Sequence, residues 1–345
     1  MNEQQQLIKD TLDRLLTDLC TKEVVDAAEA GTWAAGLWGA LTETGLTLAG
    51  IPEENGGSGG DQADSLLVIR EAARFGAPVP LAEHFIAATL LAETGAMAAT
   101  LPMTIAEGSF SLDAAGRLVG EAASVPFASW CNEMVLVADS DEGHRLCRVP
   151  LAGCTLDQGR NLAGEPRNAV SIDVQLQDDQ IFPATADTAW RMHLMGAATR
   201  GLMMSGALES ILEMSVQYSL ERSQFGRPIS KFQAIQQQLA TLAGEVAAST
   251  MAGHSIVDAF AGLDEIDIAI AKARIGESVS ISTDIAHQVH GAMGYTMEHS
   301  LNLRTRRLWS WRDEFGSEPE WQQRVGRAFL QGGADGLWAA ITARR

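Results

Sequence analysis

The segment from Arg222 to Gln233 combines the residue types best suited to binding a charged ligand. It reads RSQFGRPISKFQ. Arg222 supplies a planar guanidinium whose permanent charge suits a phosphate or pyrophosphate. Gln224 and Gln233 add neutral amides, Phe225 adds an aromatic face, and a glycine and a proline mark a turn. The pattern predicts an anion-binding turn between two helices, although an ordinary helix end can carry the same residues.

A second segment, Gln288–Tyr295, reads QVHGAMGY. Its two glycines, Gly291 and Gly294, favour a helix end at which a ligand can approach the backbone closely. Glycine pairs are also common in ordinary helix ends, so this segment indicates a ligand site only because it follows the arginine turn in the sequence. His287 and His290 flank the glutamine and fit either ligand contact or packing at the helix end.

The elements that must position these segments follow from hydrophobic periodicity. Helical spacing and a glycine-rich loop at residues 50–60 predict an α-helical domain over residues 1–101, with helices near 61–75 and 81–96. Short β-rich runs predict a small, reduced β domain over residues 102–185. Residues 186–345 return to helical spacing and predict a bundle. The fold class is therefore α+β. The expected strands are Phe110–Leu118, Met134–Ala138, Arg145–Pro150 and Val170–Leu176.

Bulk composition excludes several function classes. The formal net charge of −19 argues against a nucleic-acid partner, because phosphate backbones need a concentrated basic face. No apolar run approaches a membrane span, and no signal peptide is evident, so we expect a cytoplasmic protein. The four cysteines lack metal-ligand spacing, which predicts free thiols and no metal site.

The string R-x-Q-F-G-x-P-I-x-x-F-Q, followed by Q-x-x-G-x-x-G-Y, resembles the signature of the acyl-CoA dehydrogenase flavoproteins, and the resemblance covers almost the whole chain. It implies an N-terminal α-helical domain, a small β domain and a C-terminal bundle of four or five helices. It also implies an FAD cofactor, with both motifs approaching the flavin of a neighbouring subunit. The residues in those positions are Arg222, Gln224, Phe225, Gln233, Gln288 and Gly291.

The resemblance implies α,β-desaturation of an acyl-CoA thioester, with a carboxylate as the base and an electron-transferring flavoprotein as the acceptor. In the family, the commonest catalytic glutamate is followed by a glycine. The position of that glutamate is occupied by Phe315 in this chain. The alternative family position falls on Gly196. Glu314 is the nearest candidate base, whereas a salt-bridged turn carboxylate is the competing interpretation. Glu298 and Asp313 are weaker candidates.

The β region also departs from the family pattern. Thr104–Ser109 is a remnant of the stretch that holds the flavin of the same subunit, and Ser129–Asn132 is a poor match to the second such stretch. This combination resembles subunits of heterotetrameric α2β2 acyl-CoA dehydrogenases, often acting on bulky substrates such as steroid side-chain thioesters. Three alternatives follow: one subunit of a heteromeric enzyme, a complete homo-oligomeric dehydrogenase with Glu314 as base, or a non-catalytic protein that binds or stabilises a partner.

Overall fold

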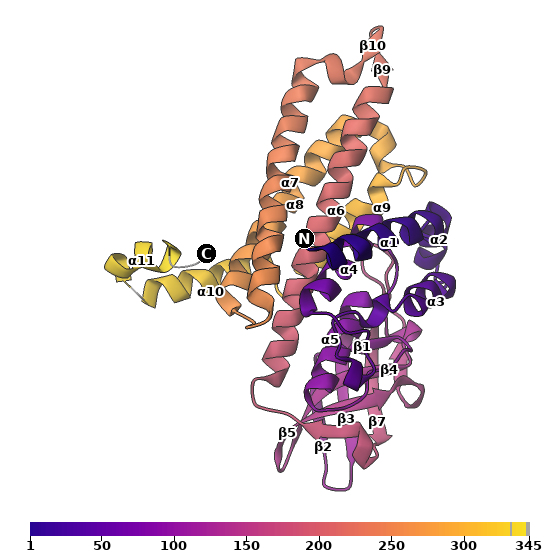
Figure 1. The fold of residues 1–345 in the computed structure, drawn as a ribbon, viewed down its shortest axis with the longest axis vertical. Helices are drawn as coiled ribbons and strands as arrows, with labels where there is room; N and C mark the ends of the chain where they lie inside the picture. The colour runs from indigo at the N-terminus through magenta and orange to yellow at the C-terminus, as the bar shows by residue number, and fades with distance from the viewer. Residues whose placement is uncertain (332, 343–345) are drawn as a thin grey trace. The chain divides into compact units, whose positions relative to one another are not determined.

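The computed structural model describes residues 1–331 and 333–342. Contacts divide the chain into two compact units, each described by itself. One unit comprises residues 1–69 and 77–196, and the other comprises residues 70–76 together with the described residues from Ala197 onward. The helices and strands follow the order helical, β, helical that the sequence predicts (Figure 1).

Five helices open the chain. The first helix begins with a capping box at Asn2, whose side chain accepts a hydrogen bond from the Gln5 backbone N–H at 2.8 Å. The fifth is buried along nearly its whole length, because most of its residues are apolar, and Glu83 and His84 are buried with them. Its His84 accepts a hydrogen bond from the Met103 backbone N–H at 3.2 Å, which ties the helix to the first strand. The helices are α1 (Glu3–Leu19), α2 (Lys22–Glu29), α3 (Ala35–Glu43), α4 (Gln62–Phe75) and α5 (Leu81–Glu93).

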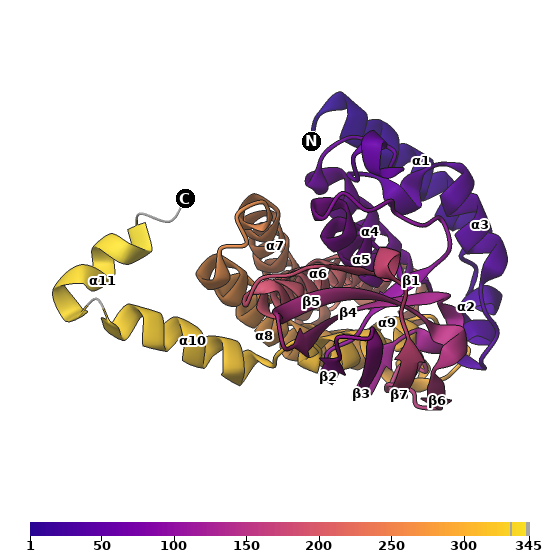
Figure 2. The same cartoon turned by 90° about the horizontal axis from the view of Figure 1, so that it is seen from below.

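An eight-stranded mixed sheet follows, in the order β6-β7-β3-β2-β4-β5-β8, with β1 parallel to β4. Figure 2 shows β2, β3, β7 and β6 in one layer, facing β4 and β5. A cluster of buried apolar side chains forms the hydrophobic core of this β region. The strands are β1 (Met103–Ile105), β2 (Ser109–Leu112), β3 (Arg117–Pro126), β4 (Glu133–Ser140), β5 (Gly143–Pro150), β6 (Thr155–Asp157), β7 (Arg167–Gln175) and β8 (Ile181–Pro183).

One predicted strand is wrong. The run Phe110–Leu118 is split into β2 and the start of β3 by a turn, in which the Asp113 carboxylate accepts hydrogen bonds from the backbone N–H groups of Ala115 and Arg117, both at 2.9 Å. An aspartate that satisfies the backbone of a turn competes with a continuous strand. The other predicted strands lie within β4, β5 and β7, apart from the terminal Leu176.

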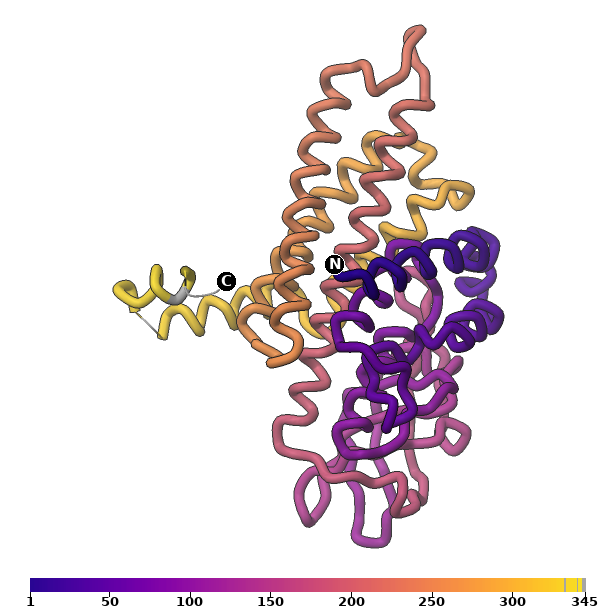
Figure 3. The backbone as a smooth tube through the Cα atoms, in the orientation of Figure 1, coloured from indigo at the N-terminus to yellow at the C-terminus, as the bar shows by residue number. Residues whose placement is uncertain are grey.

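Long helices dominate the second unit, and Figure 3 shows the backbone reversing at a narrow tip between α6 and α7. Small residues allow close helix packing, as at Gly253, where an added Cβ would lie 3.2 Å from the Ser205 hydroxyl. The elements are α6 (Thr188–Glu221), β9 (Ser223–Gln224), β10 (Arg227–Pro228), α7 (Gln233–Phe260), α8 (Glu265–His290), α9 (Leu301–Asp313), α10 (Glu318–Gln331) and α11 (Gly333–Thr342). Across the described ranges, no helix is both long and apolar enough to cross a membrane.

Candidate flavin site

The arginine turn is a miniature hairpin that presents its side chains at the tip. β9 and β10 pair antiparallel, with Gln224 opposite Arg227, and leave a loop of Phe225 and Gly226. Both loop residues have positive φ, 51° and 77°, as a type I′ turn requires. Phe225 is 91% exposed, so its aromatic ring is open to a ligand or a partner.

The polar side chains of both motifs are available to a ligand. Arg222, Gln224 and Gln288 are exposed, and within residues 1–331 and 333–342 none of their side chains makes a hydrogen bond or ion pair. A guanidinium in an acidic protein would ordinarily form an ion pair with a carboxylate, because the chain has 44 acidic residues and only 25 basic ones. The lack of such a partner in the described structure leaves Arg222 able to bind an anion.

The end of α8 offers open backbone. Gly291 has φ 59° and ψ −142°, and its N–H bonds to the carbonyl oxygen of His287. A Cβ built at Gly291 would meet nothing within 4 Å, so the space beside this backbone is empty. A ligand can therefore approach Gly291 more closely than it could approach a residue with a side chain.

Both motifs line one cavity of about 610 Å³. The C-terminal ends of α6 and α8 and the start of α7 therefore meet at this cavity, which brings the two motifs together. Of the predicted cofactor residues, only Gln233, the first residue of α7, is not among those lining the cavity. The lining residues are Tyr218, Arg222, Gln224, Phe225, Ile229, Phe232, Ala234, Ile235, Gln288, Val289, His290, Gly291, Ala292 and Met293.

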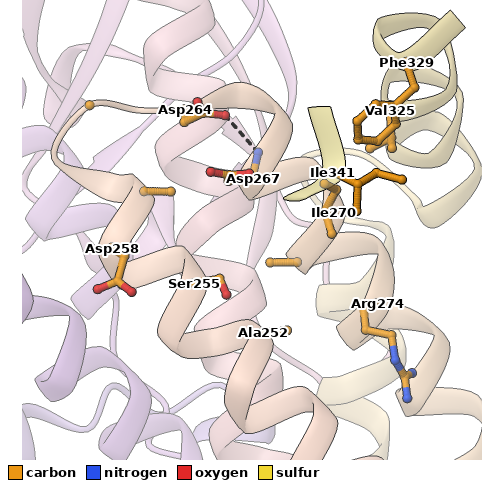
Figure 4. A pocket seen from close by; sticks show the side chains of 13 residues that line it. Ala252, Ser255, Asp258, Asp264, Asp267, Ile270, Arg274, Val325, Phe329 and Ile341 are labelled. Carbon is orange, nitrogen blue, oxygen red and sulfur yellow. Dashed lines mark hydrogen bonds between the residues drawn. The ribbon is translucent and has the colours of Figure 1, made fainter. Parts of the chain in front are cut away.

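The charge of this cavity suits a phosphate-containing ligand. Its described lining contains Arg222 and no aspartate or glutamate. A second cavity in the same unit, of about 700 Å³, is lined by Asp258, Asp264 and Asp267 along with Arg274 (Figure 4). Three carboxylates would repel a pyrophosphate. The cavity that both motifs line, called the motif cavity below, is therefore the better match for FAD. No group of three or more potential metal ligands occurs in the part of the chain that the structure describes.

The histidines beside Gln288 are buried. His287 stacks on Tyr295, with ring centroids 4.3 Å apart, and its desolvation lowers its pKa. His290 lines the cavity and stacks on Tyr218 at 4.5 Å, and its burial lowers its pKa to about 4. Both rings are therefore neutral near pH 7. Tyr218 is a cavity residue that the sequence analysis did not identify, although its position four residues before Arg222 places it on the same helix face.

Glu314, the candidate base, is held by a buried cation. Its carboxylate accepts a hydrogen bond from Arg200 Nε at 2.7 Å, and Arg200 is 1% exposed. Phe315, in the position matching the family glutamate, has φ 55° and lies against the same guanidinium, 5.2 Å from ring centroid to Cζ. The carboxylate thus neutralises a buried charge, as the salt-bridge interpretation expects.

A buried lysine on α8 fixes the same turn. Lys272 is 1% exposed and donates hydrogen bonds to the carbonyl oxygens of Trp311, Arg312 and Gly316 at 3.4, 2.8 and 3.2 Å. These carbonyls lie at and just beyond the end of α9, where helix carbonyls lack partners in their own helix. The turn carrying Glu314 is therefore anchored on both sides by buried side chains.

Family models match both ends of the chain. The N-terminal domain of acyl-CoA dehydrogenase matches residues 2–100, and its C-terminal domain matches residues 190–312. The acyl-CoA dehydrogenase IpdE2 of Mycolicibacterium smegmatis is 30% identical over 316 residues, which cover 89% of this chain and 93% of that protein. IpdE2 of Mycobacterium tuberculosis is also 30% identical, covering 88% of this chain and 91% of that protein.

Solved structures share the fold. A chain of the ChsE4-ChsE5 complex from Mycobacterium tuberculosis superposes with a TM-score of 0.86 at 21% identity, covering 96% of this chain and 98% of that one. The Tcur3481-Tcur3483 steroid ACAD gives a TM-score of 0.85 at 22% identity, covering 96% and 99%. The sequence matches and the shared architecture together show that this chain belongs to the acyl-CoA dehydrogenase family.

Proposed function

We propose that this chain is one subunit of a heteromeric, FAD-dependent acyl-CoA dehydrogenase, and that its motif cavity serves a flavin held mainly by a second acyl-CoA dehydrogenase-like subunit. The observation that carries the proposal is the meeting of both motifs in one cavity with a cation, two uncommitted amides and open backbone. A flavin held only by this chain would need the motifs of its β region, which are eroded in the sequence.

The residues of the cavity have distinct roles in this proposal. Arg222 pairs with the pyrophosphate through its planar fork. The amides of Gln224 and Gln288 bond to polar groups of the dinucleotide, and Gly291 lets the ligand approach the backbone. Phe225 packs at the subunit boundary. When bound, FAD supplies hydride acceptance in the α,β-desaturation of an acyl-CoA thioester.

We place the catalytic base on the partner subunit. A base needs a carboxylate able to take up a proton, whereas Glu314 compensates the charge of Arg200. Phe315 cannot accept a proton. The chain then contributes cofactor binding and support of the partner.

A bulky acyl-CoA, such as a steroid side-chain thioester, is the proposed substrate class, and an electron-transferring flavoprotein is the proposed acceptor. Support for the substrate comes from the likeness to the steroid ACAD Tcur3481-Tcur3483, which extends over 96% of this chain. We also propose a cytoplasmic location and the three-part division at residues 101/102 and 185/186.

The test is to purify the chain alone and together with a co-encoded acyl-CoA dehydrogenase-like subunit. The pair should bind FAD in a 1:1 ratio with the heterodimer and turn over acyl-CoA, whereas the lone chain should bind FAD weakly. Tight FAD binding and full turnover by the lone chain would instead support the complete homo-oligomeric enzyme with Glu314 as base. Lack of flavin absorbance in both preparations would favour a non-catalytic binding protein.

A further inference from the structure

Tyr218 lines the motif cavity, and the described chain provides no partner for its hydroxyl. The residue lines the cavity and lies one helical turn before Arg222 on α6. Its backbone carbonyl accepts the N–H of Arg222 at 2.9 Å, so the helix is still regular at this point. No described residue hydrogen-bonds to its hydroxyl. A phenol that lines a cavity without a partner can donate to a ligand.

The ring of Tyr218 is held in place from two sides. It stacks on His290 with centroids 4.5 Å apart and planes at 28°, and His299 lies edge-on at 6.0 Å and 89°. His290 is itself fixed, because its Nδ1 donates to the Ala286 carbonyl oxygen at 2.8 Å and the ring is 2% exposed. The stack therefore fixes the position from which the hydroxyl projects.

We propose that Tyr218 is a further cofactor-contacting residue of this cavity, that its hydroxyl donates to a phosphate oxygen of the dinucleotide beside Arg222, and that His290 is the positioning residue that fixes its ring. The inference rests on the proposed function, since it assigns the ligand of the same cavity. A phosphate oxygen is the favoured acceptor because Tyr218 and Arg222, four residues apart at the end of α6, line the same cavity, and Arg222 would pair with that phosphate.

The test is an FAD titration of the reconstituted enzyme, by flavin fluorescence, together with the melting temperature of each variant. Tyr218→Phe should weaken FAD binding about 10-fold or more, as expected for a hydrogen bond to a charged group, while the melting temperature stays unchanged. Tyr295→Phe is the matched control, because this other tyrosine also stacks on a histidine but lies outside the cavity. It should bind FAD like the wild type.

His290 is tested through its coupling to Tyr218. His290→Leu should weaken FAD binding in the wild-type background but add little in the Tyr218→Phe background, because the group it positions is already missing. His290→Phe, which restores an aromatic partner, should recover most of the affinity. An equal loss from His290→Leu in both backgrounds would show that His290 does not act through Tyr218.

The outcomes separate this inference from the proposed function. If Arg222→Met weakens FAD binding while Tyr218→Phe does not, the role of Tyr218 is overturned and the cavity remains the flavin site. If neither substitution changes FAD binding, the proposed function itself fails. An equal loss in Tyr218→Phe and Tyr295→Phe would also overturn the inference, since it would reflect a general effect of removing a phenol.

Discussion

Arg200 and Glu314, 114 residues apart in the sequence, form an ion pair at 2.7 Å in which the arginine is buried and the glutamate is 19% exposed. The pair lies at the turn where the family resemblance expects a catalytic carboxylate. This pairing supports the proposal that Glu314 stabilises the fold and that the base lies on the partner subunit.

Substituting Glu314 by Gln should therefore reduce stability more than activity. The amide removes the carboxylate charge that pairs with the buried Arg200, at a cost of roughly 3 kcal/mol in the free energy of unfolding. Flavin content and turnover of the assembled enzyme, measured well below the melting temperature, should be retained. The exposed carboxylate of Glu298 provides the control, and Glu298→Gln should change neither property. Abolished turnover with an unchanged melting temperature would make Glu314 the base.

Arg222 should contribute more to FAD binding than its neighbour Arg227 does. Arg222→Met removes a charged donor from the cavity and should weaken FAD binding by roughly 10- to 100-fold, which corresponds to about 1.5–3 kcal/mol. Arg227→Met removes a guanidinium from the same hairpin, but one that lies over the ring of Phe232 at 4.3 Å and does not line the cavity. Equal losses from both variants would point to general electrostatics instead of a specific contact.

The sequence predicted the helices and both motifs because their signals are local: periodic apolar residues, glycines at helix ends and the glycine and proline of a turn. It could not establish that Gln288 and Arg222 share a cavity, because that depends on how α6 and α8 pack. Nor could it pair Glu314 with Arg200, since a contact between distant segments leaves no mark on local spacing. The sequence predicts Phe110–Leu118 as one strand because the turn at Asp113 interrupts a β-rich run without a proline.

Gly291 should be sensitive to an added methyl group. Gly291→Ala places a Cβ in the open space beside a backbone with φ 59°, which should cost about 1 kcal/mol of stability or more and also hinder the ligand. Gly244→Ala provides the contrast, because Gly244 lies on the exposed face of α7 with nothing within 4 Å of a new Cβ. That substitution should stabilise the helix by about 0.5–1 kcal/mol. FAD affinity that is unaffected in Gly291→Ala would argue against close approach of the ligand here.

Acid should destabilise the protein through its buried histidines. Burial lowers the pKa of His84 to about 3 and that of His290 to about 4, from the ordinary histidine value of 6.5. The unfolded chain therefore binds protons below pH 6.5 that the folded chain does not, and stability falls as the pH drops from 6.5 toward 4. At pH 5 each histidine should reduce the free energy of unfolding by roughly 2 kcal/mol relative to pH 7.

Urea denaturation at pH 7 and pH 5 measures this loss. His290→Leu should remove about half of the two-histidine contribution, whereas His254→Gln, which changes an exposed histidine on α7, should leave it unchanged. A pH dependence identical in wild type and His290→Leu would show that the ring of His290 does not remain neutral in the folded chain.

Lys272 should make stability rise with pH on the alkaline side of neutrality. Burial lowers its pKa from 10.5 to about 7, so between these values the unfolded chain binds a proton that the folded chain has partly released. Wild-type stability should therefore gain a positive slope from pH 7 toward pH 10, and Lys272→Met should lose it.

The same substitution separates the charge of Lys272 from its hydrogen bonds. Lys272→Met removes a buried charge, which favours folding, but it also removes the donor to three carbonyl oxygens. The loss of these hydrogen bonds should loosen the turn that carries Glu314. Hydrogen exchange of the amides at residues 313–317 should then accelerate in Lys272→Met. Lys231→Met, at an exposed lysine before α7, should alter neither the pH slope nor this exchange. If the turn exchanges as slowly in Lys272→Met as in the wild type, the hydrogen bonds of Lys272 are not what holds the turn in place.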